Sequence, residues 1–305
     1  EPTTALDVTI QAEILDLLHD LQKQMGMAII FITHDLGLAE HYSETVCVMR
    51  NGEIVERGKI KQVFANPTHP YTAQLIHSVP KGMKDPVEGN PPELIRADDI
   101  NVHFTLKHNF FGKPLKTFHA VKNISLAIRQ GETLGIVGES GSGKSVTAMS
   151  LMRLLPENTT RYGKDSRITF DGTSILDADE KTLRSLRGGR ISFIFQEPMT
   201  SLNPFMKIGT QLMEALRVHN KTITRKAARE RILDLLNRVG IREAERRLKQ
   251  YPHEFSGGQL QRIGFARSLT LAPDLIVADE PVSALDVSVQ AQVLNLMKDL
   301  QEELG

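Results

Sequence analysis

A glycine-rich stretch, GESGSGKS, carries residue types that hold phosphate groups. Its spacing fits G-x-x-x-x-G-K-[ST], in which glycines let successive main-chain N–H groups turn toward phosphate oxygens. Lys144 would place a positive charge at the β- and γ-phosphates, and the Ser145 hydroxyl would bind Mg²⁺. We therefore expect a nucleoside triphosphate to bind at Gly138, Glu139, Ser140, Gly141, Ser142, Gly143, Lys144 and Ser145.

Two acidic residues end an apolar run near the other end of the chain, DLIVADE at 274–280. At the tip of a strand, the Asp279 carboxylate can hold Mg²⁺ through water, and Glu280 can orient or deprotonate the attacking water. Gln196 ends a second apolar run, ISFIF at 191–195, from which its side chain could reach the metal and sense the γ-phosphate. These three residues are the candidates for metal binding and hydrolysis.

A second anion-binding helix start is predicted at FSGGQLQR, residues 255–262. Small residues precede a helix that should begin near Gln259, which leaves main-chain donors available to an anion. The first loop already holds the nucleotide, so this second site is explained if it closes over a nucleotide held by another domain. Its candidate residues are Ser256, Gly257, Gly258 and Gln259.

The order of these motifs resembles that of the ATP-binding cassette (ABC) ATPases. Phosphate loop, Gln196, FSGGQ, Asp279-Glu280 and SALD at 283–286 follow one another as in that family, with Phe255 in place of the first leucine of the signature LSGGQ. The resemblance covers 98–305. It implies an α/β P-loop fold with a mostly parallel core sheet, an antiparallel β subdomain and a helical subdomain at about 197–260. It also implies two head-to-tail domains with ATP between the loop of one and the signature of the other.

The chain contains a long internal repeat. EPTTALDV at 1–8 returns as EPVSALDV at 280–287, and residues 11–26 align with 290–305, a spacing of 280 − 1 = 279 residues. This spacing is about the length of a large domain. We therefore expect 1–80 to be the C-terminal part of a first ABC domain, 81–97 a linker, and 98–305 a second domain that lacks its C-terminal part.

The resemblance gives roles to three further residues. Glu1 would be the catalytic glutamate of the first domain, and His34, after the apolar run IIFIT, resembles the switch histidine that contacts the γ-phosphate. Phe104 is a candidate to stack on adenine, although a core role is nearly as well supported. Weaker candidates for the same role are Phe110, Phe111 and Phe118.

Local patterns place these motifs on secondary structure. Apolar residues at three- and four-residue steps predict an amphipathic helix at 8–25, and Asn51-Gly52 predicts a hairpin at 44–58. The apolar runs at 27–33 and 274–280 predict buried parallel strands, and 132–138 predicts a strand before the glycine-rich turn. We expect helices at 144–155 and over much of 205–250, and a β-rich segment from about 94 to 128.

The subfamily is indicated by three stretches: NPTHPYTAQLIHSVP (66–80), QEPMTSLNP (196–204) and YPHEFSGGQ (251–259). They resemble the dipeptide, oligopeptide and nickel importer ATPases, and the two joined domains resemble the fused ATPases of glutathione or microcin C-type peptide importers. The resemblance implies an ATPase on the cytoplasmic face of the cell membrane. It would work with membrane permease subunits and indirectly with a solute-binding protein, and residues 197–250 would pass motion to the permease.

Composition limits the alternatives. Lys+Arg and Asp+Glu both number 37, so the net charge is zero and we expect no nucleic-acid partner. The single cysteine, Cys47, excludes an intramolecular disulfide and a multi-cysteine metal site. No apolar run approaches the roughly 20 residues of a membrane helix, and the chain begins with Glu and carries no signal peptide.

Two other functions and one other arrangement stay open. A non-transport tandem ABC protein would carry a long charged linker or cysteine-rich modules, and an inactive fragment would lack function altogether. Residues 1–80 lack a phosphate loop and 98–305 lack a switch histidine, so 1–80 could dock on 98–305 as a circularly permuted domain.

Overall fold

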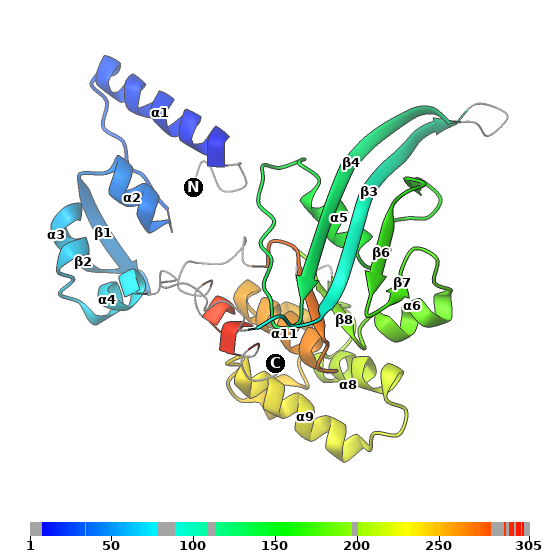
Figure 1. Cartoon of the computed structure of the whole chain (residues 1–305). Helices are drawn as coiled ribbons and strands as arrows, with labels where there is room; N and C mark the ends of the chain where they lie inside the picture. Colours follow the sequence, from blue (N-terminus) through cyan, green and yellow to red (C-terminus); the bar gives the residue numbers. More distant parts are fainter. Residues whose placement is uncertain are drawn as a thin grey trace. The chain divides into compact units, whose positions relative to one another are not determined.

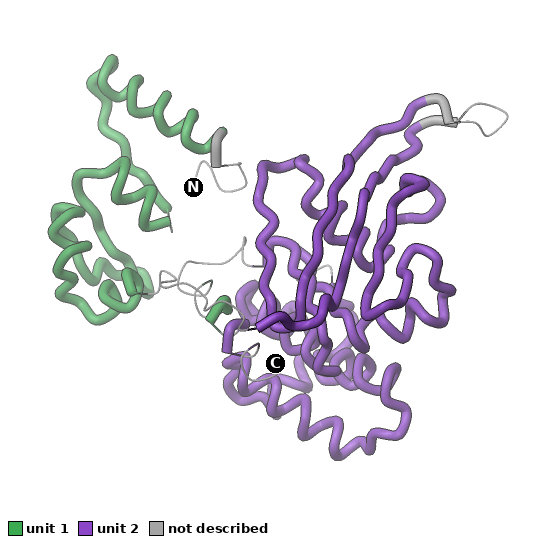
Figure 2. Tube along the Cα trace, viewed as in Figure 1, with its two compact units in different colours: residues 1–83, 285–295 green, residues 84–284, 296–305 purple. Residues whose placement is uncertain are grey.

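The computed structural model describes residues 8–33, 35–77, 89–108, 114–196, 201–281, 290, 293–295, 297–299 and 301. Its contacts divide the chain into two compact units, 1–83 with 285–295 and 84–284 with 296–305 (Figure 2). The predicted catalytic Glu1, the switch residue His34, the SALD loop, and Phe110 and Phe111 lie outside the described residues.

The first unit begins with the predicted helix, α1 (Val8–Met25), and continues with α2 (Leu36–Tyr42) (Figure 1). The predicted hairpin is confirmed as β1 (Thr45–Arg50) and β2 (Glu53–Lys59), an antiparallel pair. Asn51 and Gly52 turn the chain with positive φ angles of 52° and 85°, the left-handed conformations that a tight hairpin turn requires. Two short helices follow, α3 (Ile60–Ala65) and α4 (Pro70–His77).

A single carboxylate holds the proline-rich turn before α4. Glu56 on β2 accepts hydrogen bonds from Thr68 N at 2.8 Å, Thr68 Oγ1 at 2.9 Å and His69 N at 3.0 Å. The Thr68 N–H is the largest of the interactions that lower the pKa of Glu56, to about 2, because each favours the charged carboxylate. The hydrogen bonds thus tie the turn to the hairpin.

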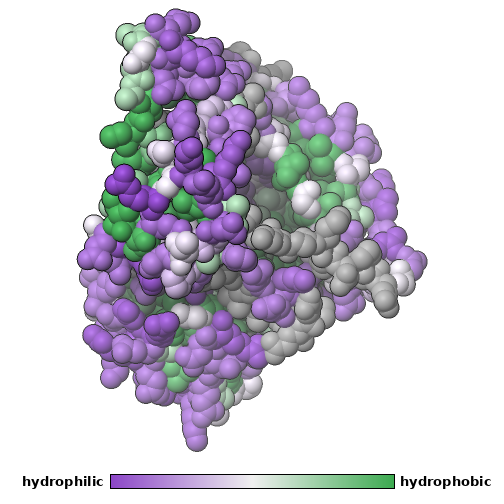
Figure 3. Space-filling model, turned by 90° about the vertical axis from the view of Figure 1, so that its left-hand side faces the viewer, coloured by the Kyte–Doolittle hydropathy of each residue, from purple (hydrophilic) through white to green (hydrophobic). Residues whose placement is uncertain are grey.

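The predicted buried strand at 27–33 is wrong. The described residues of this segment carry no strand pairing, and the side chain of Ile30 is 90% exposed. An apolar run becomes a strand only when another strand supplies its hydrogen bonds, and no partner strand lies along it among the described residues. Hydrophobic patches do reach the surface on the face of the molecule shown in Figure 3.

The second unit contains a five-stranded antiparallel sheet, which confirms the β-rich segment. Its strand order is β4-β3-β6-β7, and β5 also pairs with β3. The two long strands, β3 and β4, run together beside the shorter ones (Figure 1). The bounds are β3 (Glu93–His108), β4 (Pro114–Arg129), β5 (Thr160–Tyr162), β6 (Arg167–Phe170) and β7 (Thr173–Ser174).

Buried side chains from this sheet form the core of the unit together with the segment after the phosphate loop. Ile95, Val102, Ile168 and Phe170 are at most 1% exposed, and they belong to one hydrophobic cluster with Leu151. The cluster fixes the position of the antiparallel sheet relative to the segment that follows the phosphate loop.

A parallel pair carries the acidic residues. β8 (Ile191–Ile194) pairs with β9 (Leu275–Ala278), as the predicted parallel sheet requires. The strand predicted at 132–138 is wrong, because this segment has no strand pairing and the side chain of Val137 is 93% exposed. Residues of the segment line the same hollow as residues of β9. Within the described residues, only β8 and β9 form a parallel ladder.

The helices of the second unit follow the prediction in their order. The first, α5 (Lys144–Ser150), is shorter than expected, because Arg153 adopts a left-handed φ of 50° that ends the helical path. The predicted helical stretch is confirmed as α8, α9 and α10. The remaining bounds are α6 (Glu180–Leu186), α8 (Ile208–His219), α9 (Arg225–Arg238), α10 (Ala244–Arg247), the 3₁₀ turn η1 (Pro252–Glu254) and α11 (Gly257–Leu269).

Candidate functional site

The phosphate loop owes its shape to glycine. Gly141 and Gly143 have φ angles of 75° and 95°, which side chains of L-residues rarely allow. At Gly143 there is a second reason: a Cβ there would lie 2.7 Å from the main-chain oxygen of Ala120 on β4. Gly143 is the N-cap residue of α5 and has no side chain that could accept a hydrogen bond from the helix. The first N–H groups of α5 are therefore left for an anion.

Lys144 lies across this loop. Its Nζ donates to the main-chain oxygens of Gly138 at 2.7 Å and Glu139 at 2.9 Å. The same ammonium is 3.7 Å from Oε1 of Glu280. The side chain therefore places its charge between the loop and the acidic end of β9, where phosphate oxygens would compete for it.

Ser145 and Asp279 meet although 134 residues separate them. The Ser145 hydroxyl donates to Oδ1 of Asp279 at 2.9 Å. Asp279 is held in place because its N–H donates to the Ile194 oxygen at 3.0 Å, just beyond the β8–β9 ladder. A hydroxyl and a carboxylate oxygen are the hard ligands that Mg²⁺ prefers, so this pair fits the predicted metal.

Gln196 reaches the second acid. Its Nε2 donates to Oε2 of Glu280 at 2.7 Å. Glu280 has a φ of 44°, an uncommon angle for a non-glycine residue that turns the chain sharply after the strand. The structure thus brings the five predicted residues together in two contacting sets: Ser145 with Asp279, and Glu280 with Lys144 and Gln196. The two sets are linked because Lys144 and Ser145, and likewise Asp279 and Glu280, are neighbours in the chain.

The predicted signature forms a separate set. The Ser256 hydroxyl accepts from Gln259 N at 3.4 Å, and Ser256 N donates to Oε1 of Gln259 at 3.2 Å, a reciprocal capping box. The helix begins at Gly257, two residues earlier than expected. The Ser256 and Gln259 side chains are therefore engaged in starting α11, while Gly257 and Gly258 form its first turn.

The aromatic candidates lie on the long strands. Phe104 pairs with Phe118 in the β3–β4 register. Phe104 is half-buried and packs against the hydrophobic cluster of the unit, whereas Phe118 is 54% exposed. The core role considered for Phe104 thus accounts for its position.

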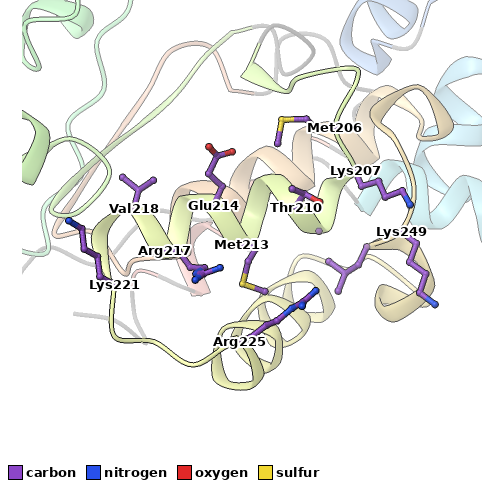
Figure 4. A pocket seen from close by; sticks show the side chains of 12 residues that line it. Met206, Lys207, Thr210, Met213, Glu214, Arg217, Val218, Lys221, Arg225 and Lys249 are labelled. Carbon is purple, nitrogen blue, oxygen red and sulfur yellow. The ribbon is translucent and has the colours of Figure 1, made fainter.

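A larger hollow than the one beside the acidic residues lies elsewhere in the described part of the second unit. It encloses about 900 Å³ along α8, next to the start of α9 (Figure 4), whereas the hollow beside Lys144, Asp279 and Glu280 encloses about 130 Å³. This groove was not predicted from the sequence, because its walls come from two separate stretches, 206–225 and 248–249. A signal was present in the repeated cations at 207, 217, 221 and 225.

Comparisons with known proteins agree on one family. The family described as ABC transporter matches residues 121–283, and the oligopeptide/dipeptide transporter C-terminal region matches 55–99. The chain is 44% identical over 301 residues to the peptidoglycan transport ATP-binding protein YejF of Agrobacterium fabrum, covering 99% of this chain and 53% of that protein. It is 44% identical over 333 residues to the glutathione import ATP-binding protein GsiA of Salmonella paratyphi A, covering 100% and 52%.

Solved structures agree with this match. The ATP-binding cassette MJ0796, in a dimeric post-hydrolysis state bound to ADP and Pi, superposes with a TM-score of 0.59 and 27% identity, covering 68% of this chain and 83% of that one. The chain spans about half the length of the curated relatives it matches. No helix in the described part of the chain is long and apolar enough to cross a membrane.

Proposed function

Because the chain belongs to the ABC transporter family, we propose that it is an ATP-binding and ATP-hydrolysing part of an importer for peptides or related small solutes. The observation that carries the proposal is that the Ser145–Asp279 contact lies beside the contacts of Glu280 with Lys144 and Gln196, next to the glycine loop. The match of 55–99 to a transporter C-terminal region favours import over a non-transport ABC protein.

The loop binds the triphosphate through its main chain. Its N–H groups and the start of α5 receive phosphate oxygens, and Lys144 exchanges the oxygens of Gly138 and Glu139 for those of the β- and γ-phosphates. Ser145 and Asp279 are the residues that would hold Mg²⁺, with Gln196 as a further ligand. The bound ion would neutralise negative charge on the phosphates.

Glu280 acts on the attacking water. Its carboxylate orients the water toward the γ-phosphorus and accepts a proton from it. Gln196 donates to this carboxylate at 2.7 Å and so fixes its direction. Ser256, Gly257, Gly258 and Gln259 close over a nucleotide held by a second domain, which supplies the corresponding groups in return.

The arrangement of domains is part of the proposal. Residues 1–80 belong to a first ABC domain, with Glu1 as its catalytic acid and His34 as its switch residue; 81–97 is a linker, and 98–305 belongs to a second domain. The partners are a second ABC domain head to tail, membrane permease subunits and, indirectly, a solute-binding protein. The assembly works on the cytoplasmic face of the membrane, and the names of YejF and GsiA favour peptide-like cargo.

The test uses the purified chain. Titration with a fluorescent ATP analogue should show Mg²⁺-dependent binding that Lys144→Ala weakens at least tenfold, while Lys181→Ala on α6 leaves it unchanged. Phosphate release should accompany binding in the parent and fall in Glu280→Gln. Nucleotide binding that is equal in the parent and in Lys144→Ala would refute the proposal.

A further inference from the structure

A separate hollow in the second unit is lined by residues of β8, α8 and α11. It encloses about 690 Å³, a volume within the usual range of sites that bind small molecules. Phe193 and Phe195 contribute aromatic rings to its wall, with ring centroids 4.6 Å apart. Met152 and Val218 add apolar side chains from two other segments. The wall therefore suits the apolar body of a small molecule.

The amide of Gln261, on α11, is buried at this wall without a partner. The residue is 2% exposed, and within the described part of the chain neither its Nε2 nor its Oε1 makes a hydrogen bond. An unpaired buried amide destabilises a folded protein, so a donor and an acceptor left unpaired on one side chain are rare. A ligand that enters the hollow can supply the missing partners.

Other polar side chains of the wall are engaged by the main chain. Nε2 of Gln211 donates to the main-chain oxygen of Met206 at 2.8 Å. Nε of Arg187 donates to the main-chain oxygen of Met152 at 2.9 Å. These bonds fix the wall itself, whereas Gln261 fixes nothing and offers its whole amide to the hollow.

A glycine keeps space open beside this amide. Gly264 follows Gln261 by three residues on α11, so the two lie on the same side of the helix, and both line the hollow. Glycine inside a helix is less favourable than alanine. Neither a positive φ nor a close packing neighbour requires it here, since a Cβ at Gly264 would meet no such neighbour within 4 Å. Its effect is to leave the hollow open next to Gln261.

We propose that this hollow binds an uncharged small molecule that carries a primary carboxamide or a cyclic amide beside an apolar body. Oε1 of Gln261 accepts from the N–H of the ligand, and Nε2 donates to its carbonyl oxygen. This two-point pair needs a donor and an acceptor on one edge of the ligand, which a trans peptide bond does not present. A carboxylate would satisfy Nε2 and leave Oε1 unpaired, so a neutral amide fits better.

The inference goes beyond the proposed function, because the hollow is lined by none of the predicted nucleotide-site residues. Its test uses the full chain without nucleotide and three probes of similar shape. Benzamide carries the carboxamide, acetophenone has a methyl group in place of the NH₂, and benzoate is an anion. Ligand-observed NMR titrations should show benzamide binding at least tenfold more tightly than either of the others, because each of them leaves an atom of Gln261 unpaired.

Variants locate the binding. Gln261→Leu should bring the affinities for benzamide and acetophenone within twofold of each other. It should not lower the urea midpoint of unfolding, because the amide has no partner to lose. Gly264→Leu should fill the hollow and weaken benzamide at least tenfold, with the helical circular dichroism signal retained. The matched control, Ala227→Leu on an exposed position of α9, should change the affinity less than twofold.

Three results would overturn the inference. Benzamide that fails to bind, or binds no more tightly than acetophenone, would mean that water alone meets Gln261. Tighter binding of benzoate than of benzamide would identify an anion site at Arg187 instead. Equal effects of Gly264→Leu and Ala227→Leu would place the benzamide outside the hollow. The proposed function fails separately, since a chain that binds benzamide selectively but binds no nucleotide keeps this site and loses the ATPase.

Discussion

Two glycines of the phosphate loop differ in a way that can be measured. Gly141 and Gly143 both have positive φ angles, 75° and 95°. A Cβ at Gly141 would meet no atom within 4 Å, whereas one at Gly143 would lie 2.7 Å from the Ala120 oxygen. Gly141→Ala therefore tests backbone strain alone, and Gly143→Ala tests the same strain together with a collision.

The magnitudes follow from these two contributions. A left-handed conformation costs an L-residue about 1–2 kcal/mol, which applies to both variants. Overpacking against a fixed neighbour adds about 1–3 kcal/mol, and a main-chain oxygen in the middle of β4 cannot rotate away as a side chain would. We expect a loss of about 1–2 kcal/mol for Gly141→Ala and about 2–5 kcal/mol for Gly143→Ala.

The assay separates folding from ligand binding. Urea unfolding gives the stability of each variant, and titration with a fluorescent ATP analogue gives its affinity. If the loop relaxes by moving, the cost appears in affinity, because the N–H groups no longer face the phosphates; Gly143→Ala should then bind at least tenfold more weakly than Gly141→Ala. Equal losses in both measurements for the two variants would refute the assigned role of Ala120.

Three further changes probe other parts of the chain. The Glu56 pKa is lowered from 4.5 to about 2 by its bonds to the turn, so folding favours the carboxylate; this stabilisation is complete above pH 4.5 and is lost as pH falls toward 2. Acid unfolding of the parent between these values should therefore exceed that of Glu56→Gln, and matching profiles would contradict the clamp. Ser256→Ala removes the cap of α11 and should cost about 0.5–2 kcal/mol in urea unfolding, whereas Ser256→Asp should largely restore it. Asp279→Asn should lower Mg²⁺-dependent nucleotide affinity while leaving Mg²⁺-independent binding unchanged; an unaltered Mg²⁺ titration would remove Asp279 from the metal site.

Local sequence signals predicted the elements whose cause is local. The Asn51-Gly52 pair determines the turn of the β1–β2 hairpin, and the apolar periodicity of 8–25 determines helix α1. The glycine loop is positioned by α5, the helix that follows it. The predictions at 27–33 and 132–138 were wrong. An apolar run shows that a segment is compatible with a buried strand, but it does not identify the neighbouring strand that must supply its hydrogen bonds. The end of α5 depends on the left-handed Arg153, for which the sequence offers no glycine as a signal.

The α8 groove was missed for a related reason. Its cations come from 207–225 and from position 249, so they do not form one continuous run in the sequence. Charge balance over the whole chain is zero, so composition could not reveal the local excess. Only the packing of α8 beside α9 and residues 248–249 brings these cations to one hollow.

The register of one parallel pair accounts for the meeting of Gln196 and Glu280. β8 and β9 pair Ile191 with Leu275 and Ile194 with Ala278, so the constant offset is 275 − 191 = 84 residues. The same offset continues beyond the ladder, since 280 − 196 = 84, and there the two side chains are joined by a 2.7 Å hydrogen bond. A slip of one residue would bring a different side chain opposite Gln196 and reverse the faces of the strand. The position of Glu280 relative to Gln196 is therefore set by the apolar residues of two four-residue strands, whose packing is as necessary for the chemistry as the polar residues that follow them.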